Sequence, residues 1–243
     1  MSIAQKSAAA FEKTFTGTGM RPWEAFSVIL DVWFVSTAIV AEENTRLPVV
    51  DYLQNTLDHA LERFDRAGVE RSVASDEVLK LTAAMVQHKG DFLGEVAAHL
   101  QTLNGKMGQY FTPHCIAELL IDIHDVEGGL YRKITENGYT TAYDPTAGSG
   151  ALLISFANRV RKIGFDPKTR LFVRATDLDD QAFKMLYIQL ANYDIPAEVR
   201  LGDTLEQEFR VRIFTPVYYS HFSKFPRRPK VALEVKDLVS LAS

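Results

Sequence analysis

The sequence predicts an α/β fold in which a helical N-terminal region precedes a mostly parallel sheet. In the first hundred residues, apolar side chains recur at intervals of three and four, the spacing of helices that bury one face. From about residue 140, short apolar runs alternate with longer helical patterns, as in βαβ units. The composition changes at 104–108, so we predict a helical region over 1–104 and a second domain over 105–243.

Composition limits the classes of protein that fit this chain. With 243 residues, 47% of them hydrophobic, it can bury a core and suits one domain or two small ones. A net charge of -4 is no basic signature, so any contact with nucleic acid must be local. The single cysteine, Cys115, excludes an internal disulfide, and metal-binding Cys and His spacings are absent. We expect a cytoplasmic protein without a metal site.

The N-terminal hundred residues are expected to build a core rather than to carry chemistry. Residues 1–20 end in a polar, glycine-rich stretch and are interpreted as a tail or turn. Helices are predicted over 23–40 and 50–64, and a third, capped by Ser75 and bent by two glycines, continues to residue 100. The most apolar segment, 25–41, contains Asp31, which favours a buried helix over a membrane span.

The most informative stretch is 144–150, Asp-Pro-Thr-Ala-Gly-Ser-Gly, between a strand expected at 140–144 and a helix at 151–163. Gly148 and Gly150 permit positive φ angles and a tight turn. Bare N–H groups at the start of a helix attract electron-rich groups, and Asp144 adds a carboxylate. Leu153 replaces the third glycine of a G-x-G-x-x-G dinucleotide pattern, so the turn alone suits several nucleotide-type ligands.

Two further carboxylates follow later strands. A strand is expected over 171–176 and ends at Asp177, where an acidic side chain suits ribose hydroxyls. After a helix over 180–193, a third strand over 197–201 leads to Gly-Asp-Thr-Leu with Asp203. Upstream of the turn, Gly-Gln-Tyr-Phe-Thr-Pro at 108–113 precedes a helical pattern, and Thr112 can cap that helix.

The motifs at 144–150 and 108–113 together resemble those of DNA adenine-N6 methyltransferases that use S-adenosyl-L-methionine (SAM), in particular the modification subunits of type I restriction-modification systems. The resemblance implies a Rossmann-like methyltransferase sheet and SAM as the cofactor. It implies that Asp203 binds the adenine amine of SAM. The cofactor-binding residues implied are Tyr110, Phe111, Thr112, Pro113, Asp144, Pro145, Thr146, Gly148, Gly150, Asp177, Leu178, Asp203 and Thr204.

The catalytic motif of that family, Asn/Asp/Ser-Pro-Pro-Tyr/Phe, is missing from this sequence. Its acceptors polarise the amine of a flipped adenine while its aromatic ring stacks on the base. The nearest candidates are Thr215, Pro216 and Tyr218, which are alternatively ordinary residues after a short strand at 211–214. Little sequence follows, so we expect a sheet shortened at its C-terminal side.

A basic, aromatic segment lies near the C-terminus, because residues 209–233 contain no Asp or Glu. Cations for phosphates and flat rings for bases are typical of nucleic-acid contacts. The alternative is a solvated basic tail whose aromatic rings pack on the core. The nucleic-acid-binding candidates are Arg210, Arg212, Tyr219, Lys224, Arg227, Arg228 and Lys230.

The sequence thus predicts a SAM-dependent methyltransferase that acts on the N6 amine of adenine in DNA, with a separate specificity subunit or methyltransferase partner to read the target. The alternative is a catalytically inactive relative that binds SAM, DNA or a methyltransferase partner as a regulator or decoy. An NAD-dependent dehydrogenase is disfavoured by the absent third glycine.

Overall fold

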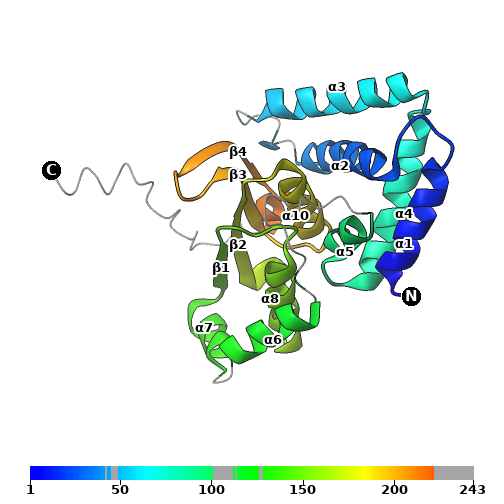
Figure 1. Cartoon of the computed structure of the whole chain (residues 1–243). Helices are drawn as coiled ribbons and strands as arrows, with labels where there is room; N and C mark the ends of the chain where they lie inside the picture. The colour runs from blue at the N-terminus through cyan, green and yellow to red at the C-terminus, as the bar shows by residue number, and fades with distance from the viewer. Residues whose placement is uncertain (42, 45–48, 101–111, 113, 126–127, 222–243) are drawn as a thin grey trace.

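The computed structural model describes residues 1–41, 43–44, 49–100, 112, 114–125 and 128–221. A helical region comes first and a four-stranded sheet with interleaved helices follows, which confirms the predicted fold class (Figure 1). The helical region consists of α1 (Ile3–Phe15), α2 (Pro22–Ala38), α3 (Val50–Ala67), α4 (Ser72–His88) and α5 (Phe92–His99). The second part consists of α6 (His114–His124), α7 (Gly129–Asn137), β1 (Thr140–Asp144), α8 (Ala151–Lys162), α9 (Pro167–Arg170), β2 (Leu171–Asp177), α10 (Asp180–Asn192), β3 (Ala197–Asp203), β4 (Glu208–Phe214) and α11 (Pro216–His221).

Two features of the helical region differ from the sequence prediction. Residues 3–15 form α1 rather than a tail, because Ser2 and Gln5 make a capping box and apolar residues spaced by three and four are buried. The predicted third helix begins at Ser72 rather than after Ser75. It is also two helices, because Lys89 adopts a left-handed conformation at the end of α4 and Asp91 caps α5.

The sheet has the order β1-β2-β3-β4, with β1, β2 and β3 parallel and β4 antiparallel to β3. Four residues, 204–207, join β3 to β4, which suffices for an antiparallel hairpin but not for a parallel crossover. The register shifts between Leu201 and Gly202. A Cβ atom on Gly202 would lie 2.1 Å from the Glu208 carbonyl oxygen, so this position requires glycine.

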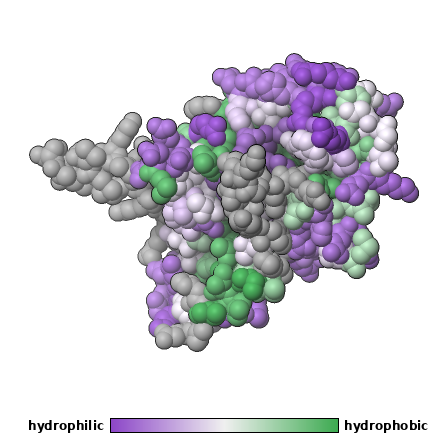
Figure 2. Space-filling model, viewed as in Figure 1, coloured by the Kyte–Doolittle hydropathy of each residue, from purple (hydrophilic) through white to green (hydrophobic). Residues whose placement is uncertain are grey.

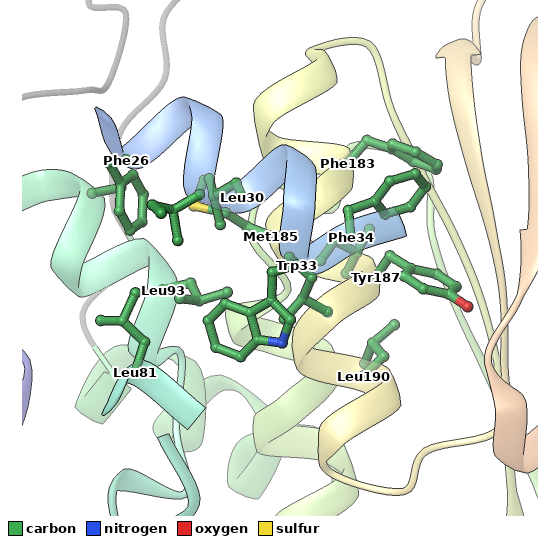
Figure 3. Packing of buried hydrophobic residues seen from close by; sticks show 14 of the residues in the cluster. Phe26, Leu30, Trp33, Phe34, Leu81, Leu93, Phe183, Met185, Tyr187 and Leu190 are labelled. Atoms are coloured by element: carbon green, nitrogen blue, oxygen red, sulfur yellow. The ribbon is translucent and has the colours of Figure 1, made fainter. Parts of the chain in front are cut away.

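One hydrophobic core joins the helical region to the sheet. In Figure 3, Phe34 and Trp33 of α2 lie against side chains of α10, and the ring centroids of Phe34 and Tyr187 are 5.2 Å apart. Within this contact the Nζ atom of Lys184 lies 2.6 Å from an oxygen of Asp31. The division predicted at 104/105 lies outside the described residues and stays a prediction.

The apolar segment at 25–41 forms α2, which buries most of its side chains in this core. In the described part of the chain, no helix is long and apolar enough to cross a membrane.

Helix α6 has an apolar outer surface. It packs on α8, and Ala117 is fully buried there. Most of the large apolar side chains of α6 face away from the core, and Figure 2 shows an apolar patch over this helix. The exposed residues are Ile116, Leu119, Leu120 and Ile123.

Candidate functional site

The turn between β1 and α8 has the geometry that its glycines predict. Gly148 and Gly150 adopt φ angles of 56° and 104°. A Cβ atom on Gly150 would lie 2.8 Å from a methyl group of Leu186, whereas one on Gly148 would meet no atom of the described residues within 4 Å. Gly150 therefore allows close packing on α10, and Gly148 leaves the outer side of the turn open to a ligand.

Three carboxylates lie along one edge of the sheet, because β1, β2 and β3 are parallel and end at Asp144, Asp177 and Asp203. The N–H of Gly148 donates to Asp177 Oδ2 at 2.7 Å, so the second carboxylate contacts the glycine turn directly. The hydroxyl of Thr204 donates to the Pro145 carbonyl at 2.8 Å and ties the β3–β4 turn to the same place. The edge is thus a single assembly of turns and carboxylates.

The described residues occupy each carboxylate only in part. Asp177 Oδ1 accepts from the Asp179 N–H at 2.9 Å, and Asp144 Oδ1 accepts from the Thr146 N–H at 3.1 Å. Asp203 Oδ1 accepts from two N–H groups of the following turn, at 2.8 and 3.2 Å. Because a carboxylate oxygen accepts more than one hydrogen bond, all three side chains retain capacity for a ligand.

Burial raises the pKa of Asp144 and of Asp177 above the ordinary value of 3.8, and the hydrogen bonds from nearby backbone N–H groups offset part of this effect. A cationic ligand beside these carboxylates would favour their charged forms and lower both pKa values.

The remaining predicted cofactor residues are placed as follows. Pro145, Thr146 and Leu178 are exposed beside the carboxylates, and Thr112 is half-buried just before α6. Tyr110, Phe111 and Pro113 lie outside the described residues.

The three catalytic candidates lie at the other end of the sheet. Thr215 is fully buried, and its hydroxyl accepts from the N–H of Ala197, the first residue of β3, at 2.9 Å. Tyr218 stacks on Phe214, and Pro216 begins α11. Since β3 has seven residues, about 20 Å of strand separates Ala197 from Asp203. The structure does not bring the catalytic candidates to the glycine turn.

The nucleic-acid candidates in the described residues make contacts within the protein. Arg212 pairs with Glu198 at 2.6 Å, and the Tyr219 hydroxyl donates to Asn44 at 3.0 Å. Arg210 is exposed and reaches the Leu178 carbonyl at 3.4 Å. Lys224, Arg227, Arg228 and Lys230 lie outside the described residues.

Comparisons with known proteins identify the family. A model of the N-6 DNA methylase family matches residues 91–214, half of the chain, and this range includes the glycine turn and the three carboxylates. The chain belongs to the N-6 DNA methylase family. It is 24% identical over 107 residues to the Type I restriction enzyme MjaIX methylase subunit of Methanocaldococcus jannaschii, an alignment that covers 44% of this chain and 17% of that relative. The chain therefore spans a small part of the relative's length. No solved structure matches the chain.

N-6 DNA methylases use SAM, which carries a sulfonium and an ammonium cation, a carboxylate and vicinal ribose hydroxyls. The glycine turn fits such a molecule, because Gly148 leaves its outer side open and the three carboxylates offer acceptors and negative charge. The confirmed resemblance and the geometry of this edge are thus consistent with each other.

The N-6 DNA methylase match begins at Asp91, which lies outside the motifs identified in the sequence. An Asp before an apolar helical run is a typical N-cap, so its role in α5 could have been predicted. Its second contact, with Ser149 of the glycine turn at 2.5 Å, had no signal in the sequence. Gln189, which contacts both residues, had none either.

Proposed function

We propose that this chain binds SAM at the glycine turn and serves as the cofactor-binding part of a DNA methyltransferase that acts on the N6 amine of adenine. The observation that carries the proposal is the row of carboxylates at the ends of β1, β2 and β3 around a left-handed glycine turn. Membership of the N-6 DNA methylase family supports both the cofactor and the reaction.

The proposed contacts follow from the chemistry of each group. Asp177 accepts from the ribose hydroxyls, and Asp203 accepts from the amine of the SAM adenine. The N–H groups at the start of α8 and the hydroxyl of Thr112 face the methionine portion, and Asp144 attracts its cationic groups. SAM supplies the methyl group, and the protein contributes chiefly by positioning it against the adenine.

The proposed substrate is an adenine in DNA that has been extruded from the helix. A partner subunit is proposed to read the target sequence, because the matched relative is named as a methylase subunit of a type I restriction enzyme. Arg210 is the basic candidate in the described residues whose exposure suits a phosphate contact.

A second function is favoured by one observation, the distance of Thr215, Pro216 and Tyr218 from the glycine turn. In this alternative the chain binds SAM without transferring its methyl group, and it acts as a regulator or decoy of a methyltransferase. Both functions require SAM binding, so two experiments are needed to separate them.

The first experiment measures SAM binding by calorimetry. We expect the wild-type chain to bind, and Asp177→Ala to weaken binding by about 1–3 kcal/mol through a lost charged hydrogen bond. Asp166→Ala is the matched control, because Asp166 also accepts from a backbone N–H, at the start of α9, and lies before β2 rather than after it. Equal affinity of the wild type and Asp177→Ala would remove Asp177 from the site.

The second experiment measures N6-methyladenine in DNA from cells that lack their own adenine methylases and express this chain. A rise that Asp144→Ala abolishes would support the methyltransferase. SAM binding without any rise, also when candidate specificity subunits are co-expressed, would favour the non-catalytic alternative. A wild-type chain that binds no SAM would contradict both functions.

A further inference from the structure

A buried carboxylate of the helical region lies directly behind the glycine turn. Asp91 is 1% exposed and accepts three hydrogen bonds. Its Oδ1 accepts from the Gly94 N–H at 3.1 Å and from the Gln189 amide at 2.8 Å, and its Oδ2 accepts from the Ser149 hydroxyl at 2.5 Å. The first bond caps α5, and the third reaches the turn between Gly148 and Gly150.

Gln189 of α10 completes this contact. Its amide nitrogen also donates to the Ser149 carbonyl at 2.8 Å, and its amide oxygen accepts from the Leu93 N–H at 3.0 Å. Asp91, the N-cap of α5, therefore accepts from the Ser149 hydroxyl, and Gln189 of α10 donates to the Ser149 carbonyl. Both of these side chains are buried. Every polar atom of the Gln189 side chain has a partner in this network.

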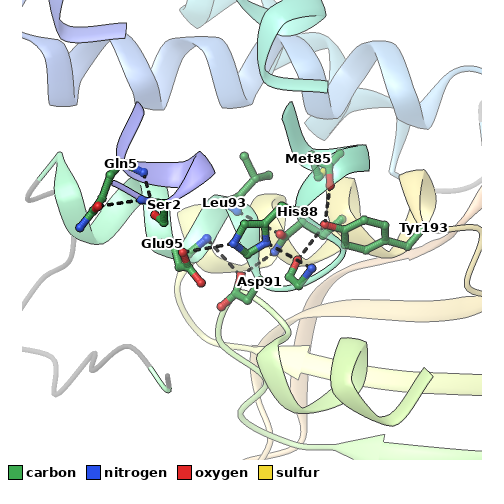
Figure 4. A network of polar contacts seen from close by, with 11 residues as sticks. Ser2, Gln5, Met85, His88, Asp91, Leu93, Glu95 and Tyr193 are labelled. Atoms are coloured by element: carbon green, nitrogen blue, oxygen red, sulfur yellow. Dashed lines mark hydrogen bonds and ion pairs between the residues drawn. The ribbon is translucent and has the colours of Figure 1, made fainter. Parts of the chain in front are cut away.

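The surroundings leave Asp91 little freedom. A Cβ atom on Gly94 would lie 2.4 Å from Asp91 Oδ2 and 2.4 Å from Ser149 Oγ, so only glycine allows this close approach. Figure 4 shows further contacts around Asp91. There the Tyr193 hydroxyl donates to the Gly90 carbonyl at 2.7 Å, and His88 lies 3.2 Å from Glu95. The segment that carries Asp91 is thus held by several contacts within the protein.

We propose that Asp91 is a positioning residue for SAM, which holds Ser149 so that the glycine turn keeps the shape that receives the cofactor. The proposal rests on the proposed function, since it concerns the same site. A turn that is already fixed loses less conformational freedom on binding, and the cofactor therefore binds more tightly. Asp91 contacts the turn at the Ser149 hydroxyl and acts through Ser149.

The experiment compares SAM affinity in three variants by calorimetry. Asp91→Ala removes the acceptor and is expected to raise the Kd about ten-fold, which corresponds to about 1.4 kcal/mol. Asp91→Asn is expected to stay within about three-fold of the wild type, because its Oδ1 still accepts while its amide can donate to the Ser149 hydroxyl. Glu77→Ala is the matched control. Glu77 is a buried carboxylate of the helical region that accepts from Thr14 and Lys80, on α1 and α4.

A second measurement tests the proposal without SAM. Amide hydrogen exchange of residues 146–150 is expected to be faster in Asp91→Ala than in the wild type and in Glu77→Ala. If Asp91→Ala does not fold, Ser149→Ala removes the same contact from the side of the turn and is expected to show the same two effects.

Three outcomes would overturn the proposal. They are an unchanged SAM affinity in folded Asp91→Ala, an equal loss of affinity in Glu77→Ala, and unchanged exchange of residues 146–150. A wild-type chain that fails to bind SAM would refute the proposed function. The exchange measurement would then still decide whether Asp91 orders the turn.

Discussion

The two ends of the sheet differ in what their polar groups do. At the carboxyl end of the parallel strands, Asp144 and Asp177 are half-buried, each accepts few hydrogen bonds, and Gly148 leaves the turn open. At the amino end, Thr215 is fully buried and its hydroxyl both donates and accepts within the protein. Open acceptors characterise a binding edge, whereas a satisfied buried hydroxyl characterises a structural contact.

The difference shows that residue type alone does not locate a site. Thr215 and Tyr218 have the hydroxyl and the ring that a base pocket needs, yet the hairpin from β3 to β4 carries them back to the amino end. Three experiments can test this contrast between the two ends.

The largest expected effect is on stability at the amino end. Thr215→Val removes the hydroxyl that donates to the Ile195 carbonyl at 2.8 Å and accepts from the Ala197 N–H. Two buried backbone groups lose their partner, so the free energy of unfolding should fall by about 3 kcal/mol. Urea denaturation measures this loss. Thr215→Ser retains the hydroxyl and should lose about 1 kcal/mol.

SAM affinity should be the same in folded Thr215→Val as in the wild type. A large loss of affinity in this variant would contradict the assignment of Thr215 to a structural contact and would break the contrast.

An intermediate effect is expected at the glycine turn. Gly148 and Gly17 both have positive φ angles, 56° and 82°, and at either position an added Cβ atom would meet none of the described residues within 4 Å. Alanine should therefore cost about 1–2 kcal/mol of stability at each, from the left-handed backbone. Only Gly148→Ala should also weaken SAM binding, about ten-fold, because its methyl group enters the open side of the turn. Equal SAM affinity in both variants would place the cofactor elsewhere.

The smallest expected effect is a pH dependence at the carboxyl end. Burial raises the pKa of Asp177 above 3.8, so this side chain gains a proton at a higher pH than an ordinary aspartate does. A protonated carboxyl attracts cations less and accepts fewer hydrogen bonds, so SAM affinity should fall a few-fold as the pH is lowered through the raised pKa. Calorimetry over a series of decreasing pH values measures this fall, which should be smaller in Asp177→Asn.

Stability should respond to the same proton with the opposite sign. Because the pKa of Asp177 is raised in the folded state, its contribution to stability is full below 3.8 and is lost as the pH rises through the raised value. The stability of the wild type relative to Asp177→Asn should therefore increase on acidification while SAM affinity decreases. Parallel changes would show that another group controls the binding.

The local elements could be predicted from the sequence to within a few residues. The strand at Thr140–Asp144, the left-handed turn at Gly148 and Gly150, and the strand that ends at Asp177 all follow from short-range signals. The first helix could not be predicted from the glycine-rich stretch after it, although Ser2 and Gln5 carry its capping signal. The helical pattern after residue 113 predicted α6, but this pattern did not show that the apolar side chains of the helix point outward.

The sequence by itself determined the family, the order of the elements and the carboxylates at the strand ends, because each depends on residues close together in the chain. Only the tertiary structure decided which residues meet across the chain. It brought Asp91 to Ser149, 58 residues later, and turned Thr215 toward the amino end of the sheet. Such contacts depend on how helices and strands pack, and a single sequence contains no local signal for packing partners.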